Sequence, residues 1–542
     1  MQRAFWIVAL LALACLLLRS ARVGLAGDYV DPISKVSAQD EALYAHGAIH
    51  IAREGNWLTP MFLGRYALYK PPLLMMAAGL SARILGISRV ALRLPVALLA
   101  SFGIGLVFLW VAELRSWQAG ACAAMLLASN HLFHVLGGLC MTDGIVVACW
   151  IAAMYCLFSD PWLESKAALW GFAAAVAGAI LTKSVAGVLP LGALGLYWLF
   201  APRKEKPTFW RVCLAAALSL ALAAPWFLYQ GIVHTRWFWT EHVAIDILAF
   251  GAGAPPQTSQ ENQALFYLMR VPGVDPVLTA FALVALPGFF GELRRRSGAA
   301  WLLACWIGMV LLAILAFRYR NISYMLPMIP ALAIVATGFG SYTTGRRAYW
   351  VLAFTVVVFA AKAAFPAAPW GLSFRSDTIQ KVAPMLSDYC ERRRAHELIV
   401  VDMADDLYAS DLPLPKVRYC LVGVGVLGGR YEMPFDFMGI VMTAAQFNDP
   451  SRWTALFSQH LREWGMNSEE PLGTVITAAS GDDLAEIIRA HPDSDFLVPE
   501  RNRKAVEQAA QADHEIVEGA DHFFVLSRRE ATLPSPPWSC RL

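Results

Sequence analysis

A polar stretch, residues 39–72, interrupts a very apolar chain and reads QDEALYAHGAIHIAREGNWLTPMFLGRYALYKPP. Two adjacent carboxylates, Asp40 and Glu41, open a predicted helix in this stretch. A carboxylate at a membrane surface can deprotonate a hydroxyl, and a second acid beside it can raise its pKa into a useful range. Acids in the first turn of a helix can also act only by offsetting the helix macrodipole. The pair therefore predicts either a general base or a stabilised helix end.

Two further charged residues stand beside apolar segments. Asp143, in CMTDGIV, lies at the mouth of two predicted spans, where an acid is costly unless it is paired or lines a polar cavity. It could also cap the helix that follows. Lys70, in YKPPLL, could extend its ammonium group to lipid headgroups or bind a phosphate as a point charge. The residue types alone leave both alternatives open at each position.

Arginines and histidines add weaker candidates. Arg318 and Arg320, in FRYRNISYMLP, could anchor a span at the membrane interface, or could bind a phosphate through a bidentate guanidinium. His46 and His50 lie four residues apart, which is workable spacing for metal ligands, although exposed histidines on an amphipathic helix are commoner. The sequence contains no GxxxxGK[ST] phosphate-binding loop.

The composition shows what must position these residues. Hydrophobic residues make up 58% of the 542, and charged residues 16%, against about 45–50% apolar residues in soluble domains. The mean hydropathy of +0.50 agrees with a multi-pass membrane protein that carries a soluble part. The net charge of +3 is small, and the basic residues lie in short connectors. That pattern indicates membrane topology and excludes a nucleic-acid-binding surface.

Segments of about 17–25 apolar residues can cross the hydrocarbon layer. The candidate spans are 4–20, 91–112, 119–137, 143–159, 167–182, 184–201, 210–230, 273–290, 299–316, 322–340 and 347–364. The positive-inside rule places the basic connectors 203–211, 292–297 and 342–347 in the cytoplasm. The parity of the spans then places the candidate residues Asp40, Glu41, Lys70, Asp143, His242 and Arg320 on the outer side, with the loops 22–70 and 231–272 and the tail.

One apolar segment, 71–88, would break this parity if it crossed the membrane. It is short, opens with two prolines and carries Arg83, so we expect an interfacial or re-entrant helix.

The tail from residue 365 alternates short β-like runs with helical stretches, which predicts a small α/β domain. The β-like runs are 397–401, 438–444, 473–478, 496–498 and 523–527, and the helical stretches include 451–465 and 481–491. If this tail is extracytoplasmic, one pair among Cys390, Cys420 and Cys540 could form a disulfide.

The ordered set of motifs resembles the polyprenyl-phosphate-sugar-dependent glycosyltransferases of the GT-C class. More narrowly, it is similar to the branch that holds the bacterial aminoarabinose transferases of lipid A and the protein O-mannosyltransferases. The first external loop of that branch reads approximately DE…YA…G.W.tP…KPPL, as in residues 39–72. Further segments agree in order, namely RLPVAL (93–98), MTDG (141–144), LTKSVAGVLP (181–190), WTEHVAID (239–246) and RYRNISYMLPMIPALAI (318–334). The resemblance covers roughly residues 1–345.

The resemblance implies roles for particular residues. Asp40 would be the catalytic base toward the acceptor hydroxyl, with Glu41 in support. Asp143 would be a second acid against the acceptor or the donor sugar. The residues implied to bind the lipid phosphate of the donor are Lys70, Arg320 and Tyr324, and His242 and Arg318 are further candidates.

The chain also departs from the family pattern. Many aminoarabinose-type members have Glu before the lysine, where this chain has Tyr69. In some relatives that Glu and the histidine of the external loop bind a metal; here His242 remains without that partner, so a divalent metal cofactor stays open. Basic residues that often follow the EH pair are replaced by Ala244, Ile245 and Asp246.

We therefore expect an all-α bundle of about 11–13 transmembrane helices of GT-C type, with a small C-terminal α/β domain. The expected domains are a membrane-embedded transferase, residues 1–364, and an extracytoplasmic domain, residues 365–542. The resemblance implies a bacterial cytoplasmic-membrane enzyme with its active site on the periplasmic side. It would move a sugar, with inversion, from a polyprenyl-phosphate donor to a hydroxyl of lipid A, a glycan or a protein. A transporter or flippase of lipid-linked sugars is the alternative, which charges near the middle of the membrane would favour.

Overall fold

The computed structural model describes a large part of the chain. The described residues are 39–62, 65–66, 68–239, 242–243, 246–247, 263–317, 321–364, 397–401, 416–422, 431–434, 474–478, 481–509, 514–520 and 523–528. The expected first span, 4–20, lies outside them, as do Arg318 and Arg320. The chain divides into two compact units. The first comprises Met1–Gly27, Gly47–Pro60 and Ala67–Arg375, and the second comprises Asp28–His46, Met61–Tyr66 and Ser376–Leu542.

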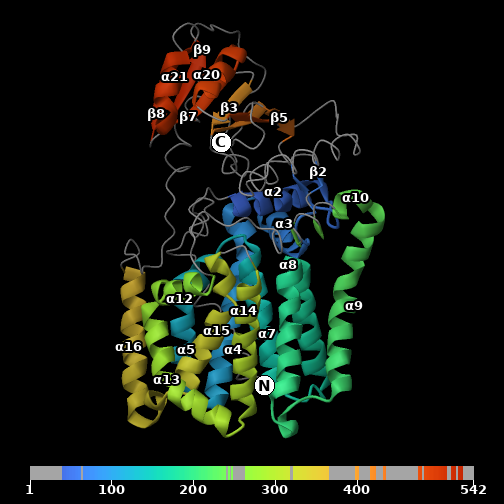
Figure 1. The fold of residues 1–542 in the computed structure, drawn as a ribbon, viewed down its shortest axis with the longest axis vertical. Coiled ribbons are helices and arrows are strands. Elements are labelled where there is room, and N and C mark those ends of the chain that lie inside the picture. Colours follow the sequence, from blue (N-terminus) through green and yellow to red (C-terminus); the bar gives the residue numbers. More distant parts are fainter. Residues whose placement is uncertain are drawn as a thin grey trace. The chain divides into compact units, whose positions relative to one another are not determined.

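The first unit is a bundle of apolar helices that run side by side (Figure 1). In the described part of the chain, seven helical segments are long and apolar enough to cross a membrane. They are α4 (Arg89–Leu114), α7 (Thr142–Ser159), α8 (Lys166–Phe200), η1 with α9 (Arg203–Glu205 and Phe209–Val233), α13 (Pro276–Arg294), α14 (Gly298–Ala316) and α16 (Gly345–Ala364). The described part of this unit also contains shorter helices, namely α3 (Leu73–Leu85), α5 (Trp117–Ala128), α6 (His131–Leu136), α10 (Thr235–Phe238), α12 (Gln263–Val274), η3 (Ile322–Met325), α15 (Met328–Gly338) and η4 (Ser341–Thr343). The multi-pass helical membrane fold expected from hydropathy is confirmed.

Helix boundaries follow from local side-chain chemistry. Four helices begin directly after a serine or threonine whose hydroxyl accepts a hydrogen bond from a backbone N–H three residues later. These caps are Ser88, Ser116, Ser165 and Thr208. Each satisfies one backbone donor that the first turn of a helix leaves unpaired, which matters most at the end of an apolar helix.

Helix α8 is a hairpin of two helical arms. The backbone leaves helical geometry at Lys183 and Ser184, and Ser184 has a positive φ of 33°. The two arms then pack so closely that a Cβ atom on Gly187 would lie 2.2 Å from the carbonyl carbon of Ala179. Only glycine permits this approach. Two separate helical arms therefore occupy the segments 167–182 and 184–201, with their reversal at residues 183–184.

Helix α3 occupies the segment that was expected not to cross the membrane. Its 13 residues would span about 20 Å at the rise of an α-helix, whereas the hydrocarbon layer is about 30 Å thick. The helix packs against the second half of α2 (Gln39–Glu54), where a Cβ on Gly79 would lie 2.9 Å from the carbonyl oxygen of Ala48. This length agrees with an interfacial helix.

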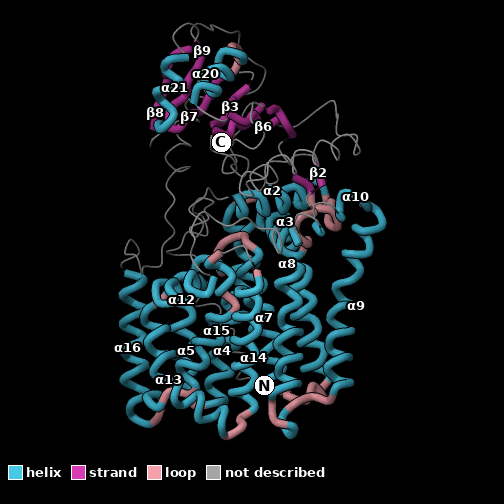
Figure 2. The backbone as a smooth tube through the Cα atoms, in the orientation of Figure 1, coloured by secondary structure: helices cyan, strands magenta, loops and turns pink. Residues whose placement is uncertain are grey.

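The basic connectors gather at one end of the bundle, and Figure 2 shows loops there between the helices. Trp162 donates from its indole N–H to the carbonyl of Lys204 at 3.1 Å, and Arg115 donates to the carbonyl of Gly340 at 3.5 Å. Asp143, Lys70 and Tyr324 lie at the other end, where α7 begins and the arms of α8 reverse. The bundle thus separates its basic connectors from its candidate site.

The second unit contains a mixed sheet. Its strands are β3 (Glu397–Val401), β4 (Lys416–Val422), β5 (Tyr431–Pro434), β6 (Thr474–Ala478), β7 (Asp495–Pro499), β8 (His514–Ala520) and β9 (Phe523–Arg528). Their order is β5-β6-β4-β3-β7-β9-β8. The four central strands are parallel, and the outer strands join them antiparallel. A two-stranded hairpin of β1 (Met61–Phe62) and β2 (Arg65–Tyr66) also belongs to this unit.

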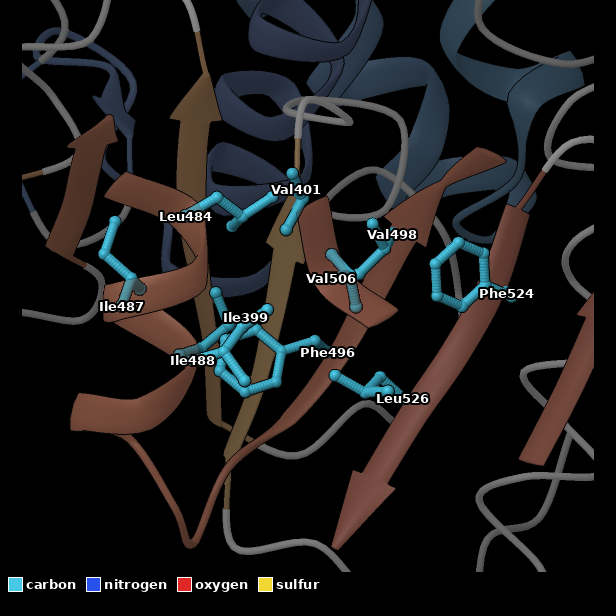
Figure 3. Packing of buried hydrophobic residues seen from close by; sticks show 10 residues of the cluster. All are labelled: Ile399, Val401, Leu484, Ile487, Ile488, Phe496, Val498, Val506, Phe524 and Leu526. Atoms are coloured by element: carbon cyan, nitrogen blue, oxygen red, sulfur yellow. The ribbon is translucent and has the colours of Figure 1, made fainter. Parts of the chain in front are cut away.

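One face of this sheet is covered by α20 (Gly481–Ala490) and α21 (Arg503–Ala509). Ile399 on β3 pairs with Phe496 on β7, which pairs with Leu526 on β9, so the three side chains share a face. Figure 3 shows them packed against side chains of both helices, including Ile488 and Val506. Successive strand residues alternate between faces, which is why every second residue of these strands enters the core.

The expected α/β character of the tail is confirmed. Runs 397–401, 473–478, 496–498 and 523–527 lie on β3, β6, β7 and β9, and 481–491 lies on α20. Runs 438–444 and 451–465 lie outside the described residues. Strands β4, β5 and β8 were not expected. Residues 423–428, GVGVLG, follow β4 with GxGxxG spacing, but the next described element is strand β5, whereas a dinucleotide fingerprint needs a helix there.

Candidate active site

Asp143 forms an ion pair with Lys183, a residue that the sequence reading did not single out. The ammonium of Lys183 donates to Oδ1 of Asp143 at 2.9 Å, and both side chains are largely buried. Asp143 lies in the first turn of α7 and Lys183 lies at the reversal of α8. The expectation that an acid at this place would be paired is therefore met. The alternative that Asp143 caps α7 is wrong, because the cap position is Met141 and makes no side-chain cap.

Close packing fixes the first turn of α7. A Cβ on Gly144 would lie 2.4 Å from Cγ1 of Val96 and 2.5 Å from the carbonyl oxygen of Leu136. The glycine of MTDG thus lets α7 approach α4 and the end of α6 at the residue beside Asp143. Packing against α4 and α6 therefore fixes the turn that carries Asp143, and the carboxylate itself pairs with Lys183.

Tyr324 lies beside the same lysine. The Nζ atom of Lys183 is 5.4 Å from the centre of the Tyr324 ring, within the range of a cation–π contact. Tyr324 belongs to the short helix η3, which Asn321 begins by accepting the backbone N–H of Ser323. The structure therefore brings together two predicted site residues, Asp143 and Tyr324, through Lys183.

Lys70 also has an acidic partner. Its ammonium donates to the carboxylate of Asp246, and both side chains are largely buried. Lys70 does not extend to lipid headgroups in this arrangement, because its ammonium group is paired with the carboxylate of Asp246. Sequence reading noted Asp246 only as a departure from the family pattern.

His242 joins these two groups. Its Nδ1 lies 3.0 Å from the carbonyl oxygen of Leu68 and its Nε2 lies 2.8 Å from Oγ of Ser184. Because a carbonyl can only accept, Nδ1 carries the proton, and Ser184 donates to Nε2 in the neutral ring. Ser184 follows Lys183 directly, and Leu68 stands two residues before Lys70. The histidine thus ties the Lys70 pair to the Asp143 pair.

Burial lowers the pKa of His242 below its ordinary value. Asp246 opposes this effect and Lys70 reinforces it. The imidazole stacks on the ring of Phe238, with the ring centres 5.1 Å apart and the planes at 11°. An apolar, closely packed surrounding disfavours the charged ring, so His242 is held neutral near pH 7.

The residues around His242 do not fit a divalent metal. Both ring nitrogens already take part in hydrogen bonds, and Tyr69 stands where a ligating Glu would be needed. Across the residues that the structure describes, no three His, Cys, Asp or Glu side chains are grouped as metal ligands. Among the other histidines considered, His50 contacts Glu54 at 3.0 Å within α2.

No role for the predicted residues Asp40, Glu41, Arg318 and Arg320 follows from the described geometry. Asp40 and Glu41 lie in the first turn of α2, and Glu41 is fully buried. Arg318 and Arg320 lie outside the described residues. The roles of all four stay predictions.

Sequence reasoning missed Lys183, Ser184 and Asp246. A signal was available for Lys183, because a charged residue in the middle of a 35-residue apolar stretch marks a turn or a buried pair. Ser184 has a positive φ, a backbone conformation that glycine adopts far more readily than other residues. Nothing local indicated that Asp246 would reach Lys70, which is 176 residues away in the sequence.

Comparison with solved structures defines the class of this fold. The chain is similar to the crystal structure of ArnT from Cupriavidus metallidurans bound to undecaprenyl phosphate, with a TM-score of 0.59 and 14% sequence identity. The match covers 98% of this chain and 99% of that one. The chain therefore has the fold of that structure, and the expected GT-C type of fold is confirmed.

Sequence comparisons narrow the resemblance. Residues 69–229 match the family model of dolichyl-phosphate-mannose-protein mannosyltransferases. An undecaprenyl phosphate-alpha-4-amino-4-deoxy-L-arabinose arabinosyl transferase of Erwinia tasmaniensis is 27% identical over 364 residues, 61% of this chain and 62% of that protein. An uncharacterized protein of Aquifex aeolicus is 24% identical over 302 residues, 55% of this chain and 58% of that protein. The chain thus spans about three fifths of the length of these curated relatives. The resemblance to the aminoarabinose transferase and protein mannosyltransferase branch is confirmed.

Proposed function

We propose that this protein is an integral membrane glycosyltransferase. It transfers a hexosyl or pentosyl group from a polyprenyl-phosphate donor to a hydroxyl of lipid A, another glycan or a protein. The observation that carries the proposal is the polar group at one end of a GT-C bundle, where His242 and Ser184 connect Lys70 with Asp143, Lys183 and Tyr324. The undecaprenyl phosphate donor for which the Erwinia tasmaniensis relative is named supports the donor class.

The proposed reaction forms one bond and breaks one. The acceptor oxygen attacks the anomeric carbon of the sugar from the face opposite the phosphate, and the bond from that carbon to the phosphate oxygen breaks. Asp40 takes the proton of the acceptor hydroxyl, and polyprenyl phosphate leaves. The configuration at the anomeric carbon inverts.

Charge development explains the need for fixed cations. The donor is a phosphodiester with one negative charge, and the leaving group is a monoester that carries nearly two. Lys70 and Arg320, with the hydroxyl of Tyr324, would stabilise this added charge as it forms. Asp143, held in place by Lys183, would accept hydrogen bonds from the sugar or the acceptor.

We propose that the polar end of the bundle faces the periplasm and that the basic connectors face the cytoplasm, following the positive-inside rule. A donor with a long lipid tail could then enter from the side, with its tail in the bilayer and its phosphate at the membrane surface. The C-terminal α/β domain would lie on the same side.

The test is sugar transfer by membranes that carry the protein or its Asp40→Ala variant. Radiolabelled polyprenyl-phosphate sugars are supplied with an extract of acceptors, and release of polyprenyl phosphate is measured. We expect release by the wild type and a loss of about 100-fold or more in the variant, the scale of general base catalysis.

The control is Glu164→Ala, which removes an exposed carboxylate in the connector between α7 and α8. It should leave release unchanged. Equal release by wild type and Asp40→Ala would move the base to another residue, with Asp143 tested next. No release by any of the three proteins, together with altered sidedness of the lipid, would favour a transporter.

A further inference from the structure

The pair formed by Lys70 and Asp246 is the starting point. The segment that carries Asp246 is anchored at its beginning, because His242 contacts both Leu68 and Ser184. Four residues later, the Asp246 carboxylate accepts a hydrogen bond from the Lys70 ammonium. Asp246 is therefore paired with Lys70, the residue that the proposed function assigns to binding of the lipid phosphate.

The charges of this group cancel within the described part of the site. Lys70 is paired with Asp246, Lys183 is paired with Asp143, and the neutral ring of His242 adds no charge. Lys70 can meet an incoming phosphate only when its pair with Asp246 opens. Here an arriving phosphate must share Lys70 with a carboxylate, and the two anions repel one another at contact distance.

We propose that Asp246 competes with the lipid phosphate for Lys70 and thereby sets how long the leaving polyprenyl phosphate stays bound. The inference rests on the proposed function. The donor displaces Asp246 from Lys70 when it binds. After transfer the phosphate carries more negative charge and would be held more tightly by Lys70, and the return of Asp246 to the lysine releases it.

Competition and positioning make opposite predictions. If Asp246 only orients Lys70, its removal loosens the lysine and weakens phosphate binding. If Asp246 competes, its removal strengthens binding, because the binding-competent state no longer has to be formed by breaking an ion pair. The sign of the change in affinity therefore decides between them.

The experiment measures binding of tritiated undecaprenyl phosphate to the purified full-length protein in lipid nanodiscs. We expect Asp246→Asn to bind it about tenfold more tightly than the wild type, as when a competent state populated at about one tenth becomes dominant. The variant should also show a lower kcat with a lower KM for the donor, because product release is slowed. Undecaprenol, which lacks the phosphate, should bind equally to both proteins.

Two further variants keep the result interpretable. Glu292→Gln removes a carboxylate from the Glu292–Arg295 ion pair near the other end of the bundle and should not change binding. Lys70→Ala should lose undecaprenyl phosphate binding. If Lys70→Ala loses binding while Asp246→Asn binds no more tightly than the wild type, the competition is overturned and the proposed function stands. If Lys70→Ala binds as the wild type does, Lys70 is not the phosphate ligand and both proposals about it fall.

Discussion

At the residue scale, the site depends on a histidine that is buried in its neutral form. His242 donates from Nδ1 to Leu68 and accepts at Nε2 from Ser184. Protonation of Nε2 would replace the acceptor by a second donor and would place a positive charge beside Lys70. Asp246, on the same segment, and backbone hydrogen bonds to Leu68 and Tyr69 would favour the charged ring, but burial outweighs them and keeps the pKa of His242 low.

The resulting pH dependence has a definite sign. The pKa of His242 in the folded protein is lowered from its ordinary value of 6.5 by burial, so the unfolded chain binds more protons than the folded one between the folded-state pKa and 6.5. The stabilising contribution of the neutral ring is complete above about pH 6.5 and is lost as the pH falls toward the folded-state pKa. We expect the Tm of the detergent-purified protein to fall between pH 7 and pH 5, and to fall less in His242→Gln.

The matched control is His491→Gln, which removes a histidine of the C-terminal domain after α20. It should keep the pH dependence of the wild type. Equal falls in Tm for the wild type and His242→Gln would show that another group causes the effect.

At the element scale, the α8 hairpin places Lys183 and Ser184 at the site. The reversal needs two arms that approach to backbone contact, and the contact falls at Gly187. An added methyl group there would meet the main chain of Ala179, which cannot rotate away as a side chain can.

Replacing Gly187 by Ala should therefore separate the arms. We expect a loss of about 3 kcal/mol or more in the free energy of unfolding, at the upper end of overpacking costs, and reduced donor binding because Lys183 moves. Thermal unfolding in detergent measures the first effect. Gly195→Ala is the control on the same helix, since a Cβ there would have no atom within 4 Å; it should be neutral or slightly stabilising. Similar losses from both variants would contradict a specific role for the contact at Gly187.

At the scale of the whole molecule, another buried ion pair connects the last described helix of the bundle to the rest. Lys362 on α16 donates to Oδ2 of Asp275 at 2.8 Å and to the carbonyl oxygen of Ser129 at 2.9 Å. Asp275 also caps α13, since its Oδ1 accepts from the N–H groups of Val277 and Leu278. The remainder of α16 is mostly exposed, so this pair is its main polar attachment within the described residues.

Lys362→Met should destabilise the bundle by about 3–5 kcal/mol, because it leaves the buried carboxylate of Asp275 uncompensated. The double variant Lys362→Met with Asp275→Asn should recover part of that loss, since asparagine removes the charge and can still cap the helix. Unfolding of the purified protein in detergent measures both. Lys166→Met, at an exposed position, is the control. If Lys166→Met lowered the free energy of unfolding as much as Lys362→Met, the buried ion pair would not be the cause of the loss.

The sequence by itself determined the class of the molecule. Apolar runs separated by basic connectors indicated most of the long helices, including the two arms of α8, and the order of the motifs indicated the GT-C resemblance. The expected spans 119–137 and 322–340 are instead broken into shorter helices, α5 with α6 and η3 with α15. Local signals also defined β3, β6, β7, β9 and α20, because a period of two or 3.6 residues is visible within a single segment. The need of Asp143 for a partner was also visible locally, because the apolar residues that make an unpaired acid costly are its neighbours in the sequence.

Only the tertiary structure decided which charges meet. Lys183 reaches Asp143 across 40 residues, Lys362 reaches Asp275 across 87, and Lys70 reaches Asp246 across 176. Nothing in the sequence around each residue encodes these partners, because the pairs form where helix ends are brought together by the packing of the whole bundle. The same is true of the sheet order β5-β6-β4-β3-β7-β9-β8. Pairing between strands depends on contacts that are distant in sequence, whereas hydropathy and periodicity report only local surroundings.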